Sequence, residues 1–377
     1  MAPKSKSKIQ NRAGNSRTQT STQTYSERKS SAYDANFEQI LIDHGSFPDS
    51  YRHPDNRRIS KPDNWNEINA VSGQRRRSLS PSRFSEEDHD VFKQKNNDAL
   101  SEKKVMSSTF PIITGDADIP SEEDKLFGNL ESFADGITDA KPDFFDGSRP
   151  AQLDPRVREG LGHFIVPSKQ GIVPILPNFF AEGKGPDGSL AVARRQALYD
   201  GTLGARAMHR LQSYGRELIY DNNAYTITSI YHSGVLRLYT THPSPSTHPE
   251  RSTDYHMVPL RSYLLDDLTD SFREGAIALR NARDWAKEKR DLFIQSANET
   301  AKIMPPNTSS RASKGSSLSN PTNSAQSRES HTSTDELTEV TTVEKPKRKL
   351  SQASQKCSER RSKSNLKSHD HHSSQKK

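Results

Sequence analysis

The sequence predicts a mixed α/β fold in which helices cover both faces of a β-sheet, with long disordered segments at the two ends of the chain. Between residues 110 and 301, stretches with apolar residues at alternate positions occur beside stretches with the helical period. Of the 377 residues, 30% are hydrophobic and 27% are charged, whereas an ordinary domain is about 45–50% apolar, glycine included. The apolar residues are sparsest near the ends, so we expect one domain of ordinary size.

The composition divides the chain into four parts. Both terminal parts are rich in polar and charged residues and have too few apolar residues to form a core. We therefore expect residues 1–30 to be disordered, residues 31–109 to form docking helices and a linker, residues 110–301 to form the α/β core, and residues 302–377 to form a disordered basic tail.

Three helices are expected before the first strand. An apolar cluster at residues 37–42 ends at Gly45 and predicts a short helix. Ser85 begins a capping-box-like sequence followed by apolar residues at helical spacing, which predicts an amphipathic helix over residues 86–104. A further helix is possible over residues 121–135.

Five strands are expected in the core, and a sixth is possible near residue 255. Two of them flank His232-Ser233-Gly234, a turn signal that predicts a hairpin. The six segments share apolar and β-branched residues between turn-forming residues, and they cover residues 142–146, 164–166, 175–184, 225–231, 235–241 and 255–260.

Three helices alternate with these strands. Asp154-Pro155 provides an N-cap and a proline at the first helical position, which opens a short helix. Ser189 caps a long helix that runs to Gly215, and a second long amphipathic helix covers residues 268–301.

Charge is distributed unevenly along the chain. The net charge is +6 for residues 1–30 and +8 for residues 302–377, so the chain total of +7 leaves −7 for residues 31–301. Nucleic-acid binding by the core would therefore depend on local patches. The single cysteine, Cys357, excludes an internal disulfide and a thiolate zinc cluster. No apolar run is long enough to cross a bilayer, so we expect no membrane partner.

Three residues have the chemistry of a metal-dependent hydrolase, namely Asp143, Glu182 and Lys184. Side chains alternate along a strand, so Glu182 and Lys184 project to the same side. An aspartate on a neighbouring strand would complete a pair of carboxylates, which is a hard oxygen site suited to Mg²⁺. A lysine two residues on can position the attacking water or stabilise developing negative charge.

Pro142-Asp143 followed by Glu182-Gly183-Lys184 and a helix resembles the PD-(D/E)XK signature of restriction-endonuclease-like phosphodiesterases. The resemblance implies that Asp143 and Glu182 bind metal and that Lys184 assists the water. The helix after the motif often carries Gln and Tyr in that superfamily, and this helix has Gln196, a further candidate, and Tyr199, at a different spacing.

A wider similarity spans roughly residues 37–290 and is to a family of uncharacterised fungal proteins. It includes Leu79-Ser80-Pro81-Ser82-Arg83-Phe84, Pro177-Asn178-Phe179-Phe180 and Leu211-Gln212-Ser213-Tyr214-Gly215. This resemblance implies a nuclease-like fold but no particular substrate.

Two functions follow from these observations. The first is Mg²⁺-dependent hydrolysis of nucleic-acid phosphodiesters by Asp143, Glu182, Lys184 and Gln196. The alternative is a catalytically inactive nuclear protein that binds nucleic acid or acts as a scaffold on the same fold. Glu-x-Lys is common by chance and Asp after Pro often caps a surface turn, so both remain open, as do DNA versus RNA and the oligomeric state.

Two basic clusters suggest partners. The long helix after Ser189 carries Arg194, Arg195, Arg206 and Arg210, which form either a solvated polar face or a track for phosphates. The tail contains a basic cluster that resembles a nuclear import signal, which an import receptor would bind. The cluster consists of Lys345, Lys347, Arg348 and Lys349. We accordingly expect a nuclear location, or otherwise a cytoplasmic one.

Overall fold

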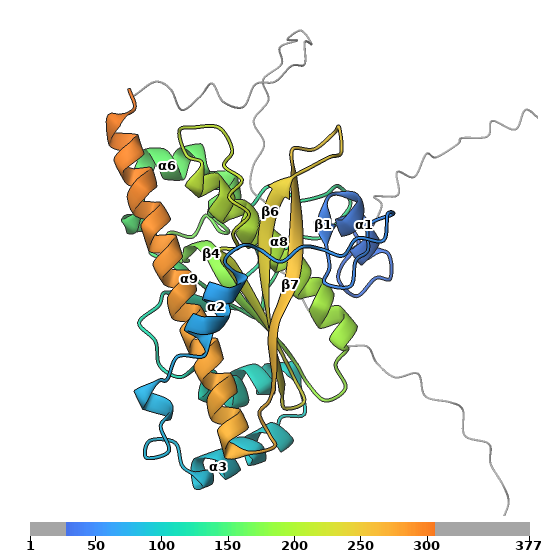
Figure 1. Ribbon diagram of the computed structural model, residues 1–377, viewed down its shortest axis with the longest axis vertical. Helices are drawn as coiled ribbons and strands as arrows, with labels where there is room; N and C mark the ends of the chain where they lie inside the picture. The colour runs from blue at the N-terminus through green and yellow to red at the C-terminus, as the bar shows by residue number, and fades with distance from the viewer. Residues whose placement is uncertain (1–27, 306–377) are drawn as a thin grey trace, which may run out of the picture. The chain divides into compact units, whose positions relative to one another are not determined.

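The fold is built on a seven-stranded mixed sheet, which the computed structural model describes within residues 28–305 (Figure 1). The strands are β1 (Ser46–Phe47), β2 (Ser121–Glu123), β3 (Phe144–Ser148), β4 (Ile175–Lys184), β5 (Thr226–His232), β6 (Val235–Pro245) and β7 (Thr253–Leu264). Their order across the sheet is β1-β7-β6-β5-β4-β3-β2. The β4–β5 and β1–β7 pairs are parallel and the other neighbours are antiparallel.

Two long helices and several short ones accompany the sheet. The N-terminal group is α1 (Phe37–Asp43), α2 (Trp65–Ser72), η1 (Arg77–Leu79), α3 (Glu86–Asn97), α4 (Glu102–Lys104), η2 (Val105–Thr109) and α5 (Phe110–Thr114). The others are η3 (Pro150–Gln152), α6 (Pro155–Gly160), α7 (Gly162–Ile165), α8 (Leu190–Gln212) and α9 (Thr269–Ile303). The predicted mixed α/β class with helices flanking the sheet is therefore confirmed.

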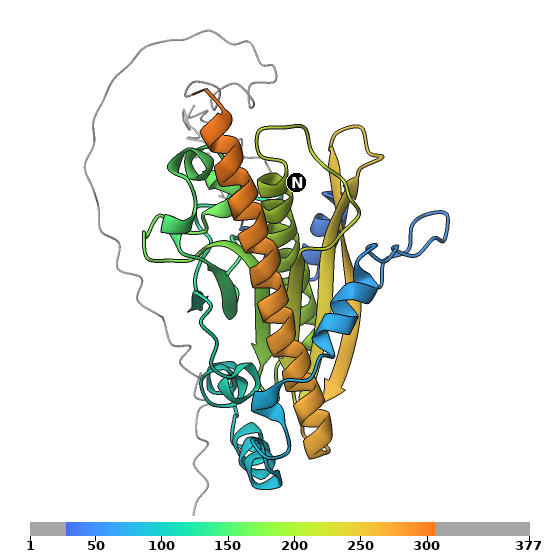
Figure 2. The same ribbon diagram turned by 60° about the vertical axis from the view of Figure 1, so that its left-hand side comes forward.

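The two long helices pack on opposite faces of the sheet (Figure 2). Because strand side chains alternate, Phe145 and Phe180 join a buried cluster with α8, whereas Phe144 and Phe179 join another with α9. The central strand β4 is buried along its whole length, as a strand covered on both faces must be.

The N-terminal helices contribute to the same core. Ile68 of α2, Phe92 of α3 and Val105 of η2 are buried in the cluster that contains the α9 side chains. The expected boundary at residue 110 falls within a run from Val105 to Thr114 that is helical throughout.

Three predicted elements were wrong in detail. Residues 121–135 contain strand β2 and turns, because residues 121–123 pair with β3 and Asp124 adopts a positive φ of 52°. Residues 162–165 form helix α7 where a strand was expected, and Ile165 is buried in a cluster with α6 and α8. The helix expected over residues 86–104 ends at Asn97, and Ser101 caps a new turn.

Most of the predicted elements are confirmed. β4 has the predicted bounds, and the hairpin of β5 and β6 turns at Ser233 and Gly234. β7 (Thr253–Leu264) extends well beyond the expected residues 255–260 at both ends, whereas α9 is close to its expected bounds. Asp154 and Ser189 cap α6 and α8 with their side chains, as their sequences indicated.

The close approach of α8 to the sheet requires glycine at position 204. A Cβ atom on Gly204 would lie 2.7 Å from the Phe180 ring, 2.8 Å from Thr226 Cγ2 and 3.1 Å from the Pro177 carbonyl oxygen. Aromatic and backbone atoms of a buried sheet cannot easily move aside. Gly204 therefore sets the distance between α8 and the strands β4 and β5.

We predict that Gly204→Ala lowers the free energy of unfolding by about 1–3 kcal/mol, as overpacked core substitutions do, although alanine favours helix. Urea denaturation would measure the change. The matched control is Gly162→Ala, where nothing lies within 4 Å of the added carbon. Equal stabilities of the two variants would contradict this account of the packing.

Candidate active site at the ends of β3 and β4

The ends of two neighbouring strands bring Asp143, Glu182 and Lys184 together. β3 and β4 are antiparallel, and their register places Asp143 opposite Glu182. The backbone N–H of Asp143 donates to Glu182 Oε1 at 3.3 Å, and the N–H of Gly183 donates to Asp143 Oδ2 at 2.8 Å. The inserted helices α6 and α7 connect the opposite ends of these strands, so they do not separate the two acids.

Lys184 lies on the same side of β4 as Glu182, as strand alternation predicts. Its Nζ donates to Glu102 Oε2 at 2.9 Å, and it lies 3.4 Å from Asp143 Oδ2 and 3.5 Å from Glu182 Oε2. Only 2% of the lysine side chain is exposed. The ammonium group is therefore held among three carboxyl groups and away from water.

Glu102 was missed by the sequence analysis. It begins α4, which Ser101 caps by accepting the N–H of Lys104 at 3.3 Å. The cap is visible in the sequence, but nothing local indicates that Glu102 reaches Lys184, which lies 82 positions further along the chain.

Helix α8 adds Gln196 and a second missed residue, Asp200, one turn apart on the same side. Both line a cavity of about 120 Å³ together with Glu182. Three buried oxygen atoms at this cavity accept no hydrogen bond within the described structure, namely Glu182 Oε2, Gln196 Oε1 and Asp200 Oδ2. The only local signal for Asp200 is its spacing of four residues from Gln196, which places both on one helical face.

Burial shifts the acids of this site towards their neutral forms. It raises the pKa of Asp143 to about 6, against the lowering effect of Lys184, and the pKa of Asp200 to about 7. Burial also raises the pKa of Glu182 well above its ordinary value, and the charges of Asp143 and Asp200 add to the shift. The neighbouring Asp200 carboxyl raises the pKa of Glu182 further, whereas Glu182 lowers the pKa of Asp200.

Lys184 remains charged in this environment. Burial alone would lower its pKa, but the nearby Glu182 and Asp143 carboxylates outweigh that effect and raise it. Burial is the main reason that the pKa values of the acids rise, and the single ammonium group of Lys184 only partly offsets it. An additional cation would offset it further.

The oxygen atoms present suit a hard divalent cation. Two carboxyl oxygens and one amide oxygen without donors are the ligand types that Mg²⁺ prefers. With the side chains in their present positions, however, no group of three or more His, Cys, Asp or Glu within residues 28–305 is arranged to hold a metal ion.

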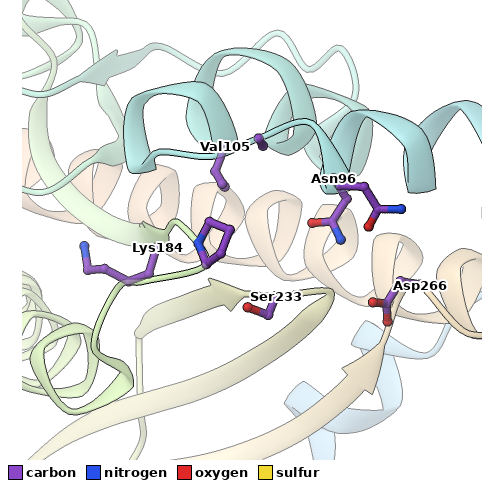
Figure 3. A pocket seen from close by; sticks show the side chains of 8 residues that line it. Asn96, Val105, Lys184, Ser233 and Asp266 are labelled. Carbon is purple, nitrogen blue, oxygen red and sulfur yellow. The ribbon is translucent and has the colours of Figure 1, made fainter. Parts of the chain in front are cut away.

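A hollow of about 270 Å³ is lined in part by Lys184, whose ammonium group points away from the other labelled lining residues (Figure 3). Ser233 of the β5–β6 turn lies on its floor, Asp266 lies at the end away from Lys184, and Asn96 and Val105 border it from the helices above. This hollow could receive a polar substrate next to the lysine.

The four predicted arginines of α8 lie in different environments. Arg194 pairs with Asp49, and Arg195 Nη1 donates to the Asp34 carbonyl at 2.9 Å. Arg206 is only 7% exposed and donates to the carbonyls of residues 131 and 132, so it supports that loop. The guanidinium of Arg210 lies 4.8 Å from the centre of the Phe164 ring.

Comparisons with protein-family models, with curated proteins and with solved structures gave no match to this chain. Within residues 28–305, no helix combines the length and the apolar character that crossing a membrane requires. The basic tail beyond residue 305 lies outside the described residues. It contains the predicted import signal, formed by Lys345, Lys347, Arg348 and Lys349.

We predict that Asp200→Asn stabilises the protein at pH 8 by up to a few kcal/mol, since one pKa unit corresponds to about 1.4 kcal/mol. The folded protein holds the Asp200 proton up to a pKa of about 7, whereas an unfolded aspartate loses it near pH 4. Stability of the wild type therefore falls as pH rises through that window. Asparagine does not ionise, so it removes the free-energy cost of ionising a buried carboxyl group. The gain in stability over the wild type should vanish near pH 4, where Asp200 of the folded protein is protonated.

Thermal denaturation between pH 4 and pH 8 would measure this difference. Asp187→Asn, on the exposed turn before α8, is the control and should change stability little at any pH. A destabilised Asp200→Asn variant at pH 8 would show that the buried carboxylate contributes favourable contacts.

Proposed function

We propose that this protein hydrolyses phosphodiester bonds of nucleic acid with the help of Mg²⁺. The observation that carries the proposal is the convergence of Asp143, Glu182 and Lys184 at the adjoining ends of β3 and β4, within 3.5 Å of one another. These residues were selected from the sequence for their chemistry, although 39 positions separate the two acids.

The arrangement of β3, β4, α8 and β5 supports a restriction-endonuclease-like core as part of this proposal. The Asp143 strand is antiparallel to the strand that ends in Glu182-Gly183-Lys184. Helix α8 then crosses to β5, which is parallel to β4. The motif thus lies at the strand end from which the next helix begins, as the resemblance to PD-(D/E)XK proteins implies.

Each residue has a distinct role in the proposed reaction. Asp143 and Glu182 would hold the metal ion, and Gln196 adds an uncharged oxygen beside Glu182. A bound Mg²⁺ would supply a water of lowered pKa and charge neutralisation at the phosphate. Lys184 orients the attacking water or stabilises negative charge that develops on the phosphate, as a fixed cation in a water-poor site can do strongly.

Glu102 has a role in positioning Lys184. Its carboxylate accepts the shortest of the lysine's bonds to an acid, and 38% of its side chain is exposed. Displacement of Glu102 would direct the ammonium group towards the hollow beside it. For contacts with nucleic acid we propose Arg194, Arg195 and Arg210, whose side chains are partly exposed, and not the buried Arg206.

A second candidate is the catalytically inactive form, a nuclear protein that binds nucleic acid or acts as a scaffold. The observation that favours it is burial, because Glu182 is 1% and Lys184 is 2% exposed. Without a metal ion, the ammonium of Lys184 and proton uptake by Glu182 together balance the acids. In such a protein the site would stabilise the fold, and partners would bind elsewhere.

We predict that Glu182→Gln abolishes Mg²⁺-dependent cleavage, because it replaces a charged ligand by a neutral one of similar shape. Lys184→Ala should reduce the cleavage rate by about 100-fold or more, as loss of a charge-stabilising donor does, while metal still binds. Cleavage of labelled DNA and RNA with Mg²⁺ or Mn²⁺ would measure activity, and calorimetry would measure metal binding, which should strengthen as pH rises and Glu182 loses its proton.

Glu288→Gln and Lys169→Ala, which change the same residue types at exposed positions, are the controls and should retain full activity. If the purified wild type neither binds metal nor cleaves any of these substrates, the binding-protein function replaces the nuclease. Equal cleavage by wild type and Glu182→Gln would reveal a contaminating enzyme.

The proposed nuclear location depends on the tail. Replacing Lys347, Arg348 and Lys349 with alanine should move a fluorescent fusion from the nucleus to the cytoplasm, because an import receptor recognises clustered positive charge. Alanine at Lys356, Lys376 and Lys377 removes the same charge outside the cluster and is the control. A wild-type fusion confined to the cytoplasm would disprove the nuclear location.

A further inference from the structure

A second polar cavity, of about 260 Å³, lies at the other end of β3 from Asp143. Its lining includes Ser148 from the end of β3 and Arg290 from α9. The five residue steps from Asp143 to Ser148 span roughly 17 Å in an extended strand. This cavity is therefore separate from the candidate active site, and its buried groups come from the α9 side of the sheet.

Arg290 is fully buried, and one of its nitrogen atoms has no hydrogen-bond partner among residues 28–305. Its Nε donates to Ser148 Oγ at 2.8 Å and its Nη1 donates to Asn178 Oδ1. Its Nη2 is buried and makes no hydrogen bond within the described structure. Both partners of Arg290 are neutral, so hydrogen bonds do not balance its charge.

The nearby acids are already paired with other cations. Asp146 accepts two hydrogen bonds from Arg283, at 2.8 and 2.9 Å, and Asp291 pairs with Lys287 at 2.5 Å. A buried charge without its own counter-ion is costly. Burial accordingly lowers the pKa of Arg290 to about 10, although Asp146 and Asp291 oppose that shift.

The rim leaves the positive charge of Arg290 uncompensated. Arg149 and Lys287 lie there with Asp118 and Asp291, so the rim charges cancel. Arg290 and Ser148 both line the cavity, and Ser148 Oγ accepts a hydrogen bond from Arg290 Nε, which leaves the hydroxyl hydrogen of Ser148 as a donor. Water could fill the space, but water would not balance the buried charge.

We propose that this cavity binds a phosphate group through Arg290 and Ser148, with Arg149 at its rim. A phosphate oxygen accepts a charge-assisted hydrogen bond from a guanidinium, which is stronger than a neutral one. The volume exceeds that of inorganic phosphate and leaves room for the first atoms of an attached ester. The phosphate is either free in solution or the terminal group of a nucleic-acid strand.

The first test is the thermal transition of the full chain, without divalent metal, over a range of inorganic phosphate concentrations at constant ionic strength. Phosphate should raise the midpoint of the wild type in a saturable way, because a ligand that binds the folded state stabilises it. Ser148→Ala and Arg290→Lys should weaken phosphate binding at least about tenfold, since each loses a hydrogen bond to a charged ligand.

Lys93→Met is the control for a general loss of positive charge, because this lysine lies on the distant helix α3 and pairs there with Asp90. Glu182→Gln should also keep the phosphate response, which separates this site from the proposed nuclease function. Ser148→Ala keeps the test decisive if Arg290→Lys does not fold. No saturable response of the wild type, or an unchanged response in Ser148→Ala, would overturn the proposal.

Competition identifies the source of the phosphate. A short single-stranded oligonucleotide, with and without a 5′-phosphate, would be added in EDTA to protein loaded with inorganic phosphate. Displacement by the phosphorylated strand alone supports a terminal phosphate of nucleic acid as the ligand. Displacement by neither strand supports free phosphate, whereas equal displacement by both would contradict a site for a phosphate monoester.

Discussion

Strand β4 ends with two ionisable side chains held away from water, and much of the surrounding structure compensates for them. The Lys184 ammonium group requires carboxylates around it, which come from Glu182 on the same strand, from Asp143 at the start of β3 and from Glu102 at the start of α4. Each of these elements must occupy its observed position for the charges to balance. Helix α8 then adds Asp200 behind Glu182, and burial raises the pKa values of both acids.

The α9 face has the opposite arrangement. Arg283 and Arg290 are buried against β3 and β4, where Asp146 neutralises one guanidinium and neutral partners bind the other. Excess acid therefore lies at one end of β3 on the α8 side, and excess positive charge lies at the other end on the α9 side. A cation would relieve the first imbalance and a phosphate the second, so both proposed ligands follow from the same energetic reasoning about unpaired buried charge.

The two candidate functions differ in what balances the acids of the first site. In a hydrolase, a divalent cation shares them with Lys184, and the lysine is then available for the phosphate that enters the neighbouring hollow. In a binding protein, Lys184 alone compensates for Asp143, Glu182 and Glu102, and proton uptake by Glu182 completes the balance. The geometry of β3 and β4 is the same in both cases. Metal affinity is consequently the property that separates them.

Local sequence determined those features that depend on neighbours along the chain. Alternation placed Glu182 and Lys184 on one side of β4, N-caps at Asp154 and Ser189 began their helices, and a turn signal defined the β5–β6 hairpin. Residues 121–135 were predicted wrongly because pairing of β2 with β3 overrides helical spacing there. Only the tertiary structure brought Asp143 to Glu182, added Glu102 and Asp200 to that site, and buried Arg290 beside Ser148. Such contacts join residues far apart in the chain, and strand register and helix packing, which local periodicity does not encode, decide them.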